Sequence, residues 1–235
     1  MKNILEALKG KLVVSCQALE NEPLHSPFIM ARMALAAAQG GAAAIRANSV
    51  ADIEAIKQQV SLPVIGIIKR DYPDSEVFIT ATLKEVDELM TVQPDIIALD
   101  ATARPRPGKQ SLAALVTEIR TRYPALTLMA DIATVDDAVT AQKLGFDCVG
   151  TTLYGYTAET AGHTLPDNNC AFLQAVLAAV SIPVVAEGNV LTPACAATCL
   201  QLGAHMVVVG GAITRPQQIT ERFMAAITTQ STDGA

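Results

Sequence analysis

Residues 183–211 begin with Pro-Val-Val-Ala-Glu-Gly-Asn and end with His-Met-Val-Val-Val-Gly-Gly. The first is a short apolar run that ends in Glu187 and is followed by Gly188, and the second is an apolar run that ends in Gly210 and Gly211. Both are typical of a buried parallel strand followed by a tight turn. Between the two runs, Thr192 and Pro193 are suited to begin a helix, and Gly203 can end it in the left-handed conformation. The segment therefore predicts a strand–helix–strand unit. Its glycine turns would leave backbone N–H groups open to an anion such as phosphate.

The composition indicates a globular protein with a large buried core. The chain has 235 residues, of which 51% are hydrophobic and 17% charged. Its net charge is −6 and its aromatic content is 4%, so it lacks the basic and aromatic character of a nucleic-acid-binding protein. No apolar run is long enough to cross a membrane, and residues 1–10 lack the apolar core of a signal peptide. We expect a cytoplasmic protein without nucleic-acid or membrane partners.

The cysteines and histidines do not follow a metal-binding pattern. The five cysteines include no Cys-x-x-Cys pair, and the three histidines share no ligand spacing. Cys195 and Cys199 are four residues apart and share one face of the expected helix. We expect the cysteines to be small buried side chains in a reducing compartment. We expect no structural metal site.

The rest of the chain repeats the strand–helix unit at a period of about 25 to 30 residues, which is typical of α/β proteins. Eight such units, with no Gly-x-Gly-x-x-Gly motif after the first strand, predict a (βα)8 TIM barrel preceded by a short N-terminal helix at residues 3–9. A flavodoxin-like sheet is the alternative, but it normally has fewer strands. No linker divides the sequence. We therefore expect a single catalytic domain over residues 1–229 and a disordered tail over 230–235.

The expected elements outside the opening segment follow from apolar runs and helix caps. Ser49 and Thr134 are predicted to cap helices, and the longest loop is expected at 154–168. Strands are expected at 11–17, 42–48, 62–69, 95–100, 126–131 and 146–152. The expected helices include 28–39, 83–90, 111–122, 135–144, 172–179 and 216–228.

Polar residues or glycines end nearly every expected strand. In a (βα)8 barrel the carboxyl ends of all strands surround one opening, where active sites lie. One charged residue at a strand end is usually a solvated charge, but so many around one opening indicate a functional site. The residues expected there are Gln17, Arg46, Lys69, Asp100, Asp131, Glu187, Gly188, Gly210 and Gly211.

Lys69 is the main candidate for chemistry. It follows two isoleucines at the barrel rim, where burial and a nearby arginine would lower its pKa. It would then be suited to act as a base or as a Schiff-base nucleophile. Its alternative role is a counter-ion for Asp100 or Asp131. Glu187 is the expected second acid–base group, and a salt bridge between Glu187 and Arg46 is compatible with that role.

A phosphate site is expected after the last two strands, which is its usual place in this fold. Arg215 lies five residues after Gly210 and opens the last expected helix. It would bind the phosphate together with the backbone N–H groups of the glycines. The alternative is that Arg215 is an ordinary surface charge.

Several segments match a pattern more specific than the fold. The most specific are Lys-Arg-Asp-Tyr at 69–72 and Asp-Ala-Thr-Ala-Arg-Pro at 100–105. Ala-Ile-Arg-Ala-Asn at 44–48, Ala-Glu-Gly-Asn at 186–189 and Val-Gly-Gly-Ala-Ile-Thr at 209–214 agree with them. Together they resemble the N-acetylmannosamine-6-phosphate 2-epimerase family, and the resemblance spans nearly the whole chain.

The resemblance implies reversible conversion of N-acetylmannosamine 6-phosphate to N-acetylglucosamine 6-phosphate in sialic acid breakdown, with no metal or nicotinamide cofactor. It implies that Lys69 transfers the proton at C2 and that Glu187 assists ring opening or protonation. Arg46 would also stabilise the developing oxyanion. The substrate-binding residues that it implies are Gln17, Arg46, Asp131, Gly188, Gly210, Gly211 and Arg215.

Two other interpretations of the same residues stay open. A Schiff-base aldolase on this barrel would also use Lys69, and a non-catalytic barrel would only bind a sugar phosphate. Exchange of the C2 hydrogen with solvent would support the epimerase, whereas a lysine adduct trapped by borohydride would support the aldolase. No motif determines the oligomeric state, and a homodimer is the working expectation.

Overall fold

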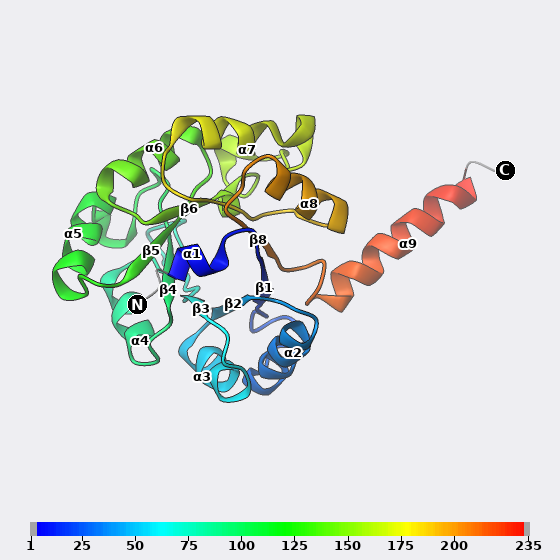
Figure 1. Cartoon of the computed structure of the whole chain (residues 1–235), viewed down its shortest axis with the longest axis horizontal. Coiled ribbons are helices and arrows are strands. Elements are labelled where there is room, and N and C mark those ends of the chain that lie inside the picture. The colour runs from blue at the N-terminus through cyan, green and yellow to red at the C-terminus, as the bar shows by residue number, and fades with distance from the viewer. Residues whose placement is uncertain (1–3, 233–235) are drawn as a thin grey trace.

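The computed structural model describes residues 4–232, and its eight parallel strands close into a barrel in sequence order (Figure 1). Each strand pairs with the next, and β1 pairs with β8 to close the barrel, with Val13 opposite Val208. This confirms the predicted (βα)8 barrel. The strands are β1 Leu12–Cys16, β2 Ala44–Asn48, β3 Val64–Ile67, β4 Ile96–Asp100, β5 Thr127–Asp131, β6 Cys148–Gly150, β7 Val184–Ala186 and β8 Met206–Val209.

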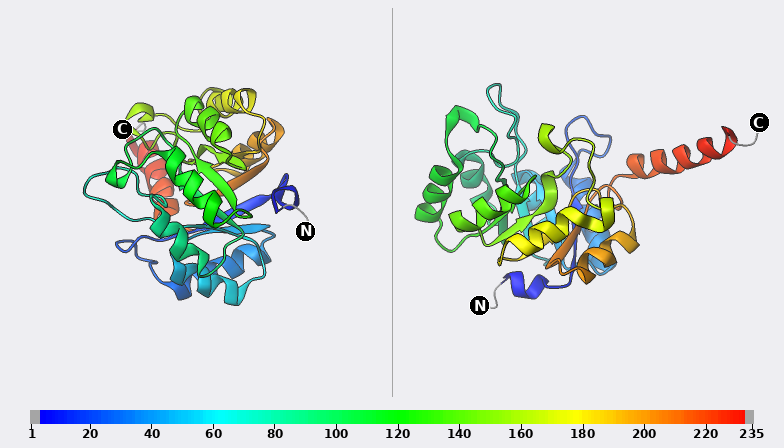
Figure 2. Two further views of the ribbon diagram at one scale, coloured as in Figure 1. Left: turned by 90° about the vertical axis from the view of Figure 1, so that its left-hand side faces the viewer. Right: turned by 90° about the horizontal axis from the view of Figure 1, so that it is seen from above.

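The strands are mainly apolar because both faces of the sheet are covered, and most of their polar residues lie toward the carboxyl ends. Inward-facing side chains such as Ile65 and Ile96 form one cluster inside the barrel, and outward-facing ones such as Ile45 and Ile97 pack against the surrounding helices. Leu5 and Leu8 of the short helix α1 (Ile4–Leu8) join the inner cluster. Figure 2 shows α1 at the end of the barrel opposite the long loops. One end is thus sealed by apolar side chains, which leaves the other end for a site.

The connecting helices begin at the caps that the sequence predicts. The side-chain oxygens of Ser49, Thr134 and Thr192 each accept a hydrogen bond from the backbone N–H three residues further on. Among the described residues, no helix combines the length and the apolar character that a membrane span requires. The larger helices are α2 Pro27–Gln39, α3 Val50–Gln59, α4 Leu83–Met90, α5 Leu112–Arg122, α6 Val135–Leu144, α7 Asp167–Ala179, α8 Pro193–Gln201 and α9 Pro216–Thr232.

Several predicted boundaries differ from the structure; the strand expected at 62–69, for example, spans Val64–Ile67. Two further boundaries are also wrong. The strand expected at 146–152 ends at Gly150, and a 3-10 turn follows at Thr151–Leu153. The reason is that the Thr151 hydroxyl donates to the Glu187 carbonyl and accepts from the Glu187 N–H, so a side chain replaces the strand pairing. Helix α7 begins at Asp167 rather than at residue 172, through three residues, 168–170, with positive φ.

Helix α9 extends away from the barrel in Figure 1 and in the right-hand view of Figure 2. Its side chains Phe223, Met224 and Ile227 are 69%, 56% and 59% exposed. The helix continues to Thr232, so the domain boundary predicted at residue 229 falls inside it. Of the disordered tail predicted at 230–235, residues 230–232 continue this helix, and 233–235 lie outside the described residues. The exposed apolar face of α9 is a candidate contact surface, because exposed apolar patches commonly mark contact sites.

Candidate active site

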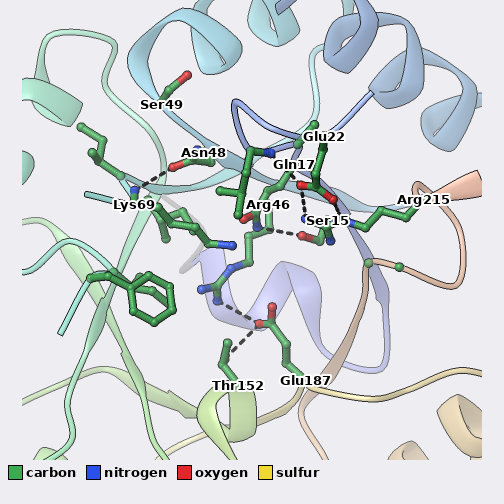
Figure 3. Close-up of a pocket in the computed structure, with 18 of the residues that line it drawn as sticks. Ser15, Gln17, Glu22, Arg46, Asn48, Ser49, Lys69, Thr152, Glu187 and Arg215 are labelled. Carbon is green, nitrogen blue, oxygen red and sulfur yellow. Dashed lines mark hydrogen bonds and ion pairs between the residues drawn. The ribbon is translucent and has the colours of Figure 1, made fainter. Parts of the chain in front are cut away.

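The carboxyl ends of the strands surround a cavity of about 1340 Å³ (Figure 3). This is the end of the barrel at which the fold places active sites, and the cavity is large enough for a sugar phosphate. Asp100 and Asp131 do not line it. The other residues predicted for the opening do line it, together with Arg215, which shows that the strand ends bring these residues together: Gln17, Arg46, Lys69, Glu187, Gly188, Gly210, Gly211 and Arg215.

Arg46, in β2, is the central charged residue of the cavity and is only 1% exposed. Its two terminal nitrogens donate to the two carboxylate oxygens of Asp131, at 3.0 and 2.6 Å. One of these nitrogens also donates to Glu187 Oε2 at 2.8 Å. Burial, the largest influence, lowers the pKa of Arg46, but the two carboxylates outweigh it and raise the pKa. Arg46 therefore stays cationic and is held in one orientation.

Asp131, the last residue of β5, lies behind Arg46 rather than at the cavity surface. Its side chain is fully buried, and both of its oxygens are engaged by Arg46. The structure therefore gives Asp131 a positioning contact with Arg46. The predicted direct contact of Asp131 with the sugar stays a prediction.

Thr152 was missed by the sequence analysis. Its hydroxyl lies 2.7 Å from Asp131 Oδ1 and 3.2 Å from Glu187 Oε2, so it links the two carboxylates that flank Arg46. Figure 3 shows the contact between Thr152 and Glu187. The sequence did place Thr152 just after a strand, two residues beyond Gly150 at the end of β6. Threonine is common at such positions, so this placement alone does not identify a functional residue.

Lys69 lies just beyond the end of β3. Its backbone N–H donates to the side chain of Asn48 at 2.8 Å, and its backbone pairs with Ile79 in an antiparallel bridge. Burial, followed by the positive charges of Arg215 and Arg46, lowers the pKa of Lys69 to about 8. Lys69 forms no ion pair with any residue in the part of the chain that the structure describes. Near neutral pH a useful fraction of the amine is therefore uncharged and able to take a proton.

Glu187 follows β7, and its side chain is 12% exposed. Burial is the largest influence and raises its pKa to about 7, with Asp131 adding to the increase and Arg46 opposing it. A carboxyl with this pKa can donate or accept a proton at neutral pH. The salt bridge between Glu187 and Arg46 that the sequence analysis considered is present. It is compatible with a role of Glu187 as an acid or base.

The glycines and Arg215 form the other side of the cavity. Gly188 has a φ of +98°, and a Cβ there would lie 3.3 Å from the Thr151 carbonyl oxygen, so glycine suits this turn. Arg215 pairs with Glu22 of the loop between β1 and α2, with Nε 2.6 Å from Oε1 and Nη2 3.1 Å from Oε2. Glu22 gave no sequence signal, because it lies in an irregular loop.

Two buried polar atoms at this site have no hydrogen-bond partner among the described residues. They are Gln17 Oε1 and Arg46 Nε. Gln17 Nε2 donates to the Ser15 hydroxyl at 2.8 Å, which fixes the amide orientation. An unpaired buried polar group costs about 1–3 kcal/mol. A hydroxyl- or amide-bearing ligand that pairs with these atoms would offset that cost, which fits an amino sugar.

Asp100 was expected at the opening, but its carboxylate is occupied by its own loop. It accepts hydrogen bonds from the N–H and hydroxyl of Thr102 and pairs with Arg104 at 2.5 Å. Burial raises its pKa, and Arg104 opposes the increase. Asp100 thus stabilises the loop after β4, and the structure separates it from the acid–base groups.

The geometry and electrostatics define a general acid–base enzyme on a (βα)8 barrel. Lys69 and Glu187 have pKa values of about 8 and 7, and a buried cation lies beside Glu187 in the same cavity. Such a set can remove a proton from carbon, stabilise the resulting oxyanion and return the proton. None of these steps needs a group from outside the chain.

Comparison with known proteins gives the particular family. A family model described as "Putative N-acetylmannosamine-6-phosphate epimerase" matches residues 30–229. Relatives that carry the corresponding 2-epimerase name come from Enterobacter sp. (strain 638), 78% identical over the whole of both chains, and Shouchella clausii (strain KSM-K16), 61% identical over 97% of this chain and 100% of the relative. The chain belongs to the N-acetylmannosamine-6-phosphate 2-epimerase family.

A solved structure supports the same assignment. The N-acetylmannosamine-6-phosphate 2-epimerase from Clostridium perfringens is 52% identical, with a TM-score of 0.90 over 95% of this chain and 96% of the other. A thiamine phosphate pyrophosphorylase from Pyrococcus furiosus is 19% identical, with a TM-score of 0.60 over 93% of each chain, and shares the fold alone. The family resemblance inferred from the sequence is thereby confirmed.

Proposed function

We propose that the cavity interconverts N-acetylmannosamine 6-phosphate and N-acetylglucosamine 6-phosphate, as a step of sialic acid breakdown. The observation that carries the proposal is that Lys69 and Glu187, with pKa values of about 8 and 7, line one cavity. Two groups with pKa values near neutrality are what a proton transfer in both directions requires. The names of the relatives supply the substrate.

The proton at C2 becomes acidic only when the sugar is open and C1 is an aldehyde. Ring opening moves a proton from the C1 hydroxyl to the ring oxygen, and Glu187 is the group that we assign to this transfer. Neutral Lys69 then removes the C2 proton and becomes an ammonium. The electrons of the C–H bond form a C1–C2 double bond, and the aldehyde oxygen becomes an enolate. The protonated carboxyl of Glu187 then donates a proton to the opposite face of C2, which restores the aldehyde with inverted configuration. Loss of the proton from Lys69 to water and uptake of a proton by Glu187 return both groups to their starting states.

Arg46 is suited to stabilise the enolate. It is a buried cation whose orientation is fixed by Asp131, so little reorganisation is needed as negative charge develops. Its Nε lacks a protein partner among the described residues and is free to donate to a ligand oxygen. Gln17 Oε1 also has no hydrogen-bond partner among the described residues, and it would accept a hydrogen bond from the N-acetyl N–H or from a hydroxyl of the sugar. Gly188, Gly210, Gly211 and Arg215 would hold the phosphate.

Proton NMR of N-acetylmannosamine 6-phosphate in D₂O tests the proposal. We expect the C2 proton signal to disappear as N-acetylglucosamine 6-phosphate accumulates, because the proton on the base exchanges with solvent. Epimerisation with full retention of the original C2 proton would contradict the mechanism. Borohydride added with substrate should leave no adduct on Lys69, and an adduct would favour the aldolase. Tight binding of the substrate without any turnover would favour the non-catalytic barrel.

We also propose a homodimer formed through α9. The helix extends from the barrel with Phe223, Met224 and Ile227 exposed, and such an apolar face is stabilised by contact with a second protein surface. We propose a second copy of this chain as the partner, because a self-association requires no other protein.

We place the enzyme in the cytoplasm, where phosphorylated sugars are metabolised and where free cysteines persist.

A further inference from the structure

Three cysteines gather on the outside of the barrel, between α7 and α8. Cys170 lies near the start of α7, and Cys195 and Cys199 lie on one face of α8. Their sulfur atoms all lie within 4.8 Å of one another. The sequence showed only the pair on α8, because Cys170 is brought to that pair by the packing of the two helices. The prediction that the cysteines are merely buried small side chains therefore left out a cluster.

The cluster is distinct from the catalytic cavity. None of its three cysteines lines that cavity. Cys170 and Cys199 are 2% and 0% exposed, whereas Cys195 is half-buried and gives access from solvent. The site thus has two deep ligands and one at its entrance, an arrangement that lets an ion enter without unfolding the protein.

The spacing of the sulfur atoms suits a single metal ion. A metal–sulfur bond of about 2.3 Å corresponds to sulfur–sulfur distances of about 3.8–4.0 Å for tetrahedral or trigonal coordination. Sulfur atoms within 4.8 Å of one another are at most about 1 Å beyond that spacing. Thiolates are soft ligands and select soft ions over magnesium or calcium.

The backbone at Cys170 is unusual. Cys170 has a φ of +57° and follows Asn168 and Asn169, which have φ values of +50° and +58°. The left-handed region costs an L-residue about 1–2 kcal/mol. The chain nevertheless adopts it at the turn that carries the Cys170 sulfur toward α8, and strain of this kind concentrates at functional positions.

We propose that Cys170, Cys195 and Cys199 form a three-thiolate site for a soft d10 metal ion. Among residues 4–232, the cluster includes no histidine or carboxylate as a fourth ligand. Structural zinc sites are almost always closed by four protein ligands. The site therefore suits a three-coordinate ion such as Cu⁺, Cd²⁺ or Hg²⁺, or an ion whose fourth position faces solvent beside Cys195.

Titration of the reduced protein with CdCl₂, followed by the ultraviolet thiolate-to-cadmium charge-transfer band, tests the site. We expect one Cd²⁺ per chain and an intensity that corresponds to three thiolates. Cys195→Ser should weaken binding by about 100-fold or more, because a metal site loses at least that much when a ligand rather than an outer partner is removed. Cys148→Ala is the matched control, since it removes a buried cysteine outside the cluster, and it should bind Cd²⁺ as the wild type does.

Thermal melting separates a binding defect from a folding defect. Cd²⁺ should raise the melting temperature of the wild-type protein and of Cys148→Ala, and it should have little effect on Cys195→Ser or Cys199→Ala. Wild-type protein that binds no Cd²⁺, or Cys195→Ser and Cys199→Ala variants that bind it with wild-type affinity, would overturn the proposal. The readout is metal binding alone and is independent of the proposed epimerase activity.

Discussion

Arg215 and Glu22 form a two-point ion pair at the mouth of the cavity, with nitrogen–oxygen distances of 2.6 and 3.1 Å. The carboxylate lies along the edge of the guanidinium group that would also fit two oxygens of a phosphate. Hydrogen bonding from Arg215 is the main cause of a lowered pKa for Glu22, so this carboxylate is charged at neutral pH. A phosphate bound at Arg215 must therefore displace Glu22 or share the guanidinium with it.

Replacing Glu22 should strengthen phosphate binding. Glu22→Gln removes a negative charge that competes for Arg215, and the pair is partly exposed, so we expect the KM for the phosphorylated substrate to fall about two- to fivefold. Glu54→Gln removes an exposed carboxylate of α3 that does not line the cavity, so it is the matched control and should leave KM unchanged. A higher KM in Glu22→Gln would instead mean that Glu22 holds Arg215 in its binding orientation.

The Arg215→Ala variant should show the opposite effect. We expect it to weaken phosphorylated ligands far more than unphosphorylated N-acetylmannosamine, because only the former present an anion to the guanidinium group. Isothermal titration with the two ligands measures the difference. Equal weakening of both ligands would show that Arg215 is not a phosphate contact.

Lys69 is expected to carry the proton transfer at C2. Lys69→Ala should lower the rate of C2 hydrogen exchange about 10²–10⁴-fold while sugar-phosphate binding largely survives. The exchange is measured by NMR in D₂O, and binding by titration calorimetry. Lys84→Ala removes an exposed lysine from α4 and serves as the control. Exchange near the wild-type rate in Lys69→Ala would remove this residue from the mechanism.

The activity should follow a bell-shaped dependence on pH. Lys69 acts as a base when neutral, so activity falls as the pH drops below its pKa of about 8. Glu187 acts as an acid when protonated, so activity falls as the pH rises above its pKa of about 7. Because the base has the higher pKa, we expect a maximum of kcat/KM at about pH 7.5. In Glu187→Gln, the fall in activity on the alkaline side should disappear from the remaining activity. An unchanged pH profile in that variant would exclude Glu187 as the acid.

The barrel and most of its site could be predicted from the sequence because the fold itself gathers the strand ends. Arg46, Lys69 and Glu187 need only the correct strand assignment to be placed at one opening. The side-chain contacts could not be predicted in this way. Asp131 ends its strand as expected, yet its carboxylate pairs with Arg46. The carboxylate of Asp100 instead contacts Thr102 and Arg104 of the loop that follows β4.

Contacts made by irregular segments were also beyond sequence reasoning. Glu22 reaches Arg215 from a loop without periodicity, and its partner lies 193 residues away in the chain. Cys170 meets Cys199 only because α7 and α8 pack together. Periodicity reveals which faces of elements are buried, but it carries no information on which polar side chains meet across two elements.

The exposed face of α9 should support self-association. Phe223→Glu places a charge on this face, and we expect it to shift the protein from dimer to monomer in analytical ultracentrifugation, since burying an unpaired charge is costly. Ala113→Glu adds the same charge on the exposed surface of α5 and should leave the dimer intact. A wild-type protein that sediments as a monomer at micromolar concentration would contradict the proposed assembly.

Catalysis should survive exhaustive chelation. The carboxylates nearest the reaction are already paired, since Asp131 uses both oxygens on Arg46 and Glu187 uses one. A divalent ion at that place would have to compete with a buried guanidinium group. The three cysteines of the proposed metal site, Cys170, Cys195 and Cys199, do not line the cavity, so removing a metal from that site should leave turnover unchanged.

To test this prediction, enzyme treated with EDTA would be assayed alone and with added Mg²⁺, Mn²⁺ or Zn²⁺. If activity were lost and one metal restored it, Asp100, Asp131 or Glu187 would have to be reassigned as a metal ligand, and Arg46 would no longer be the main stabiliser of the enolate.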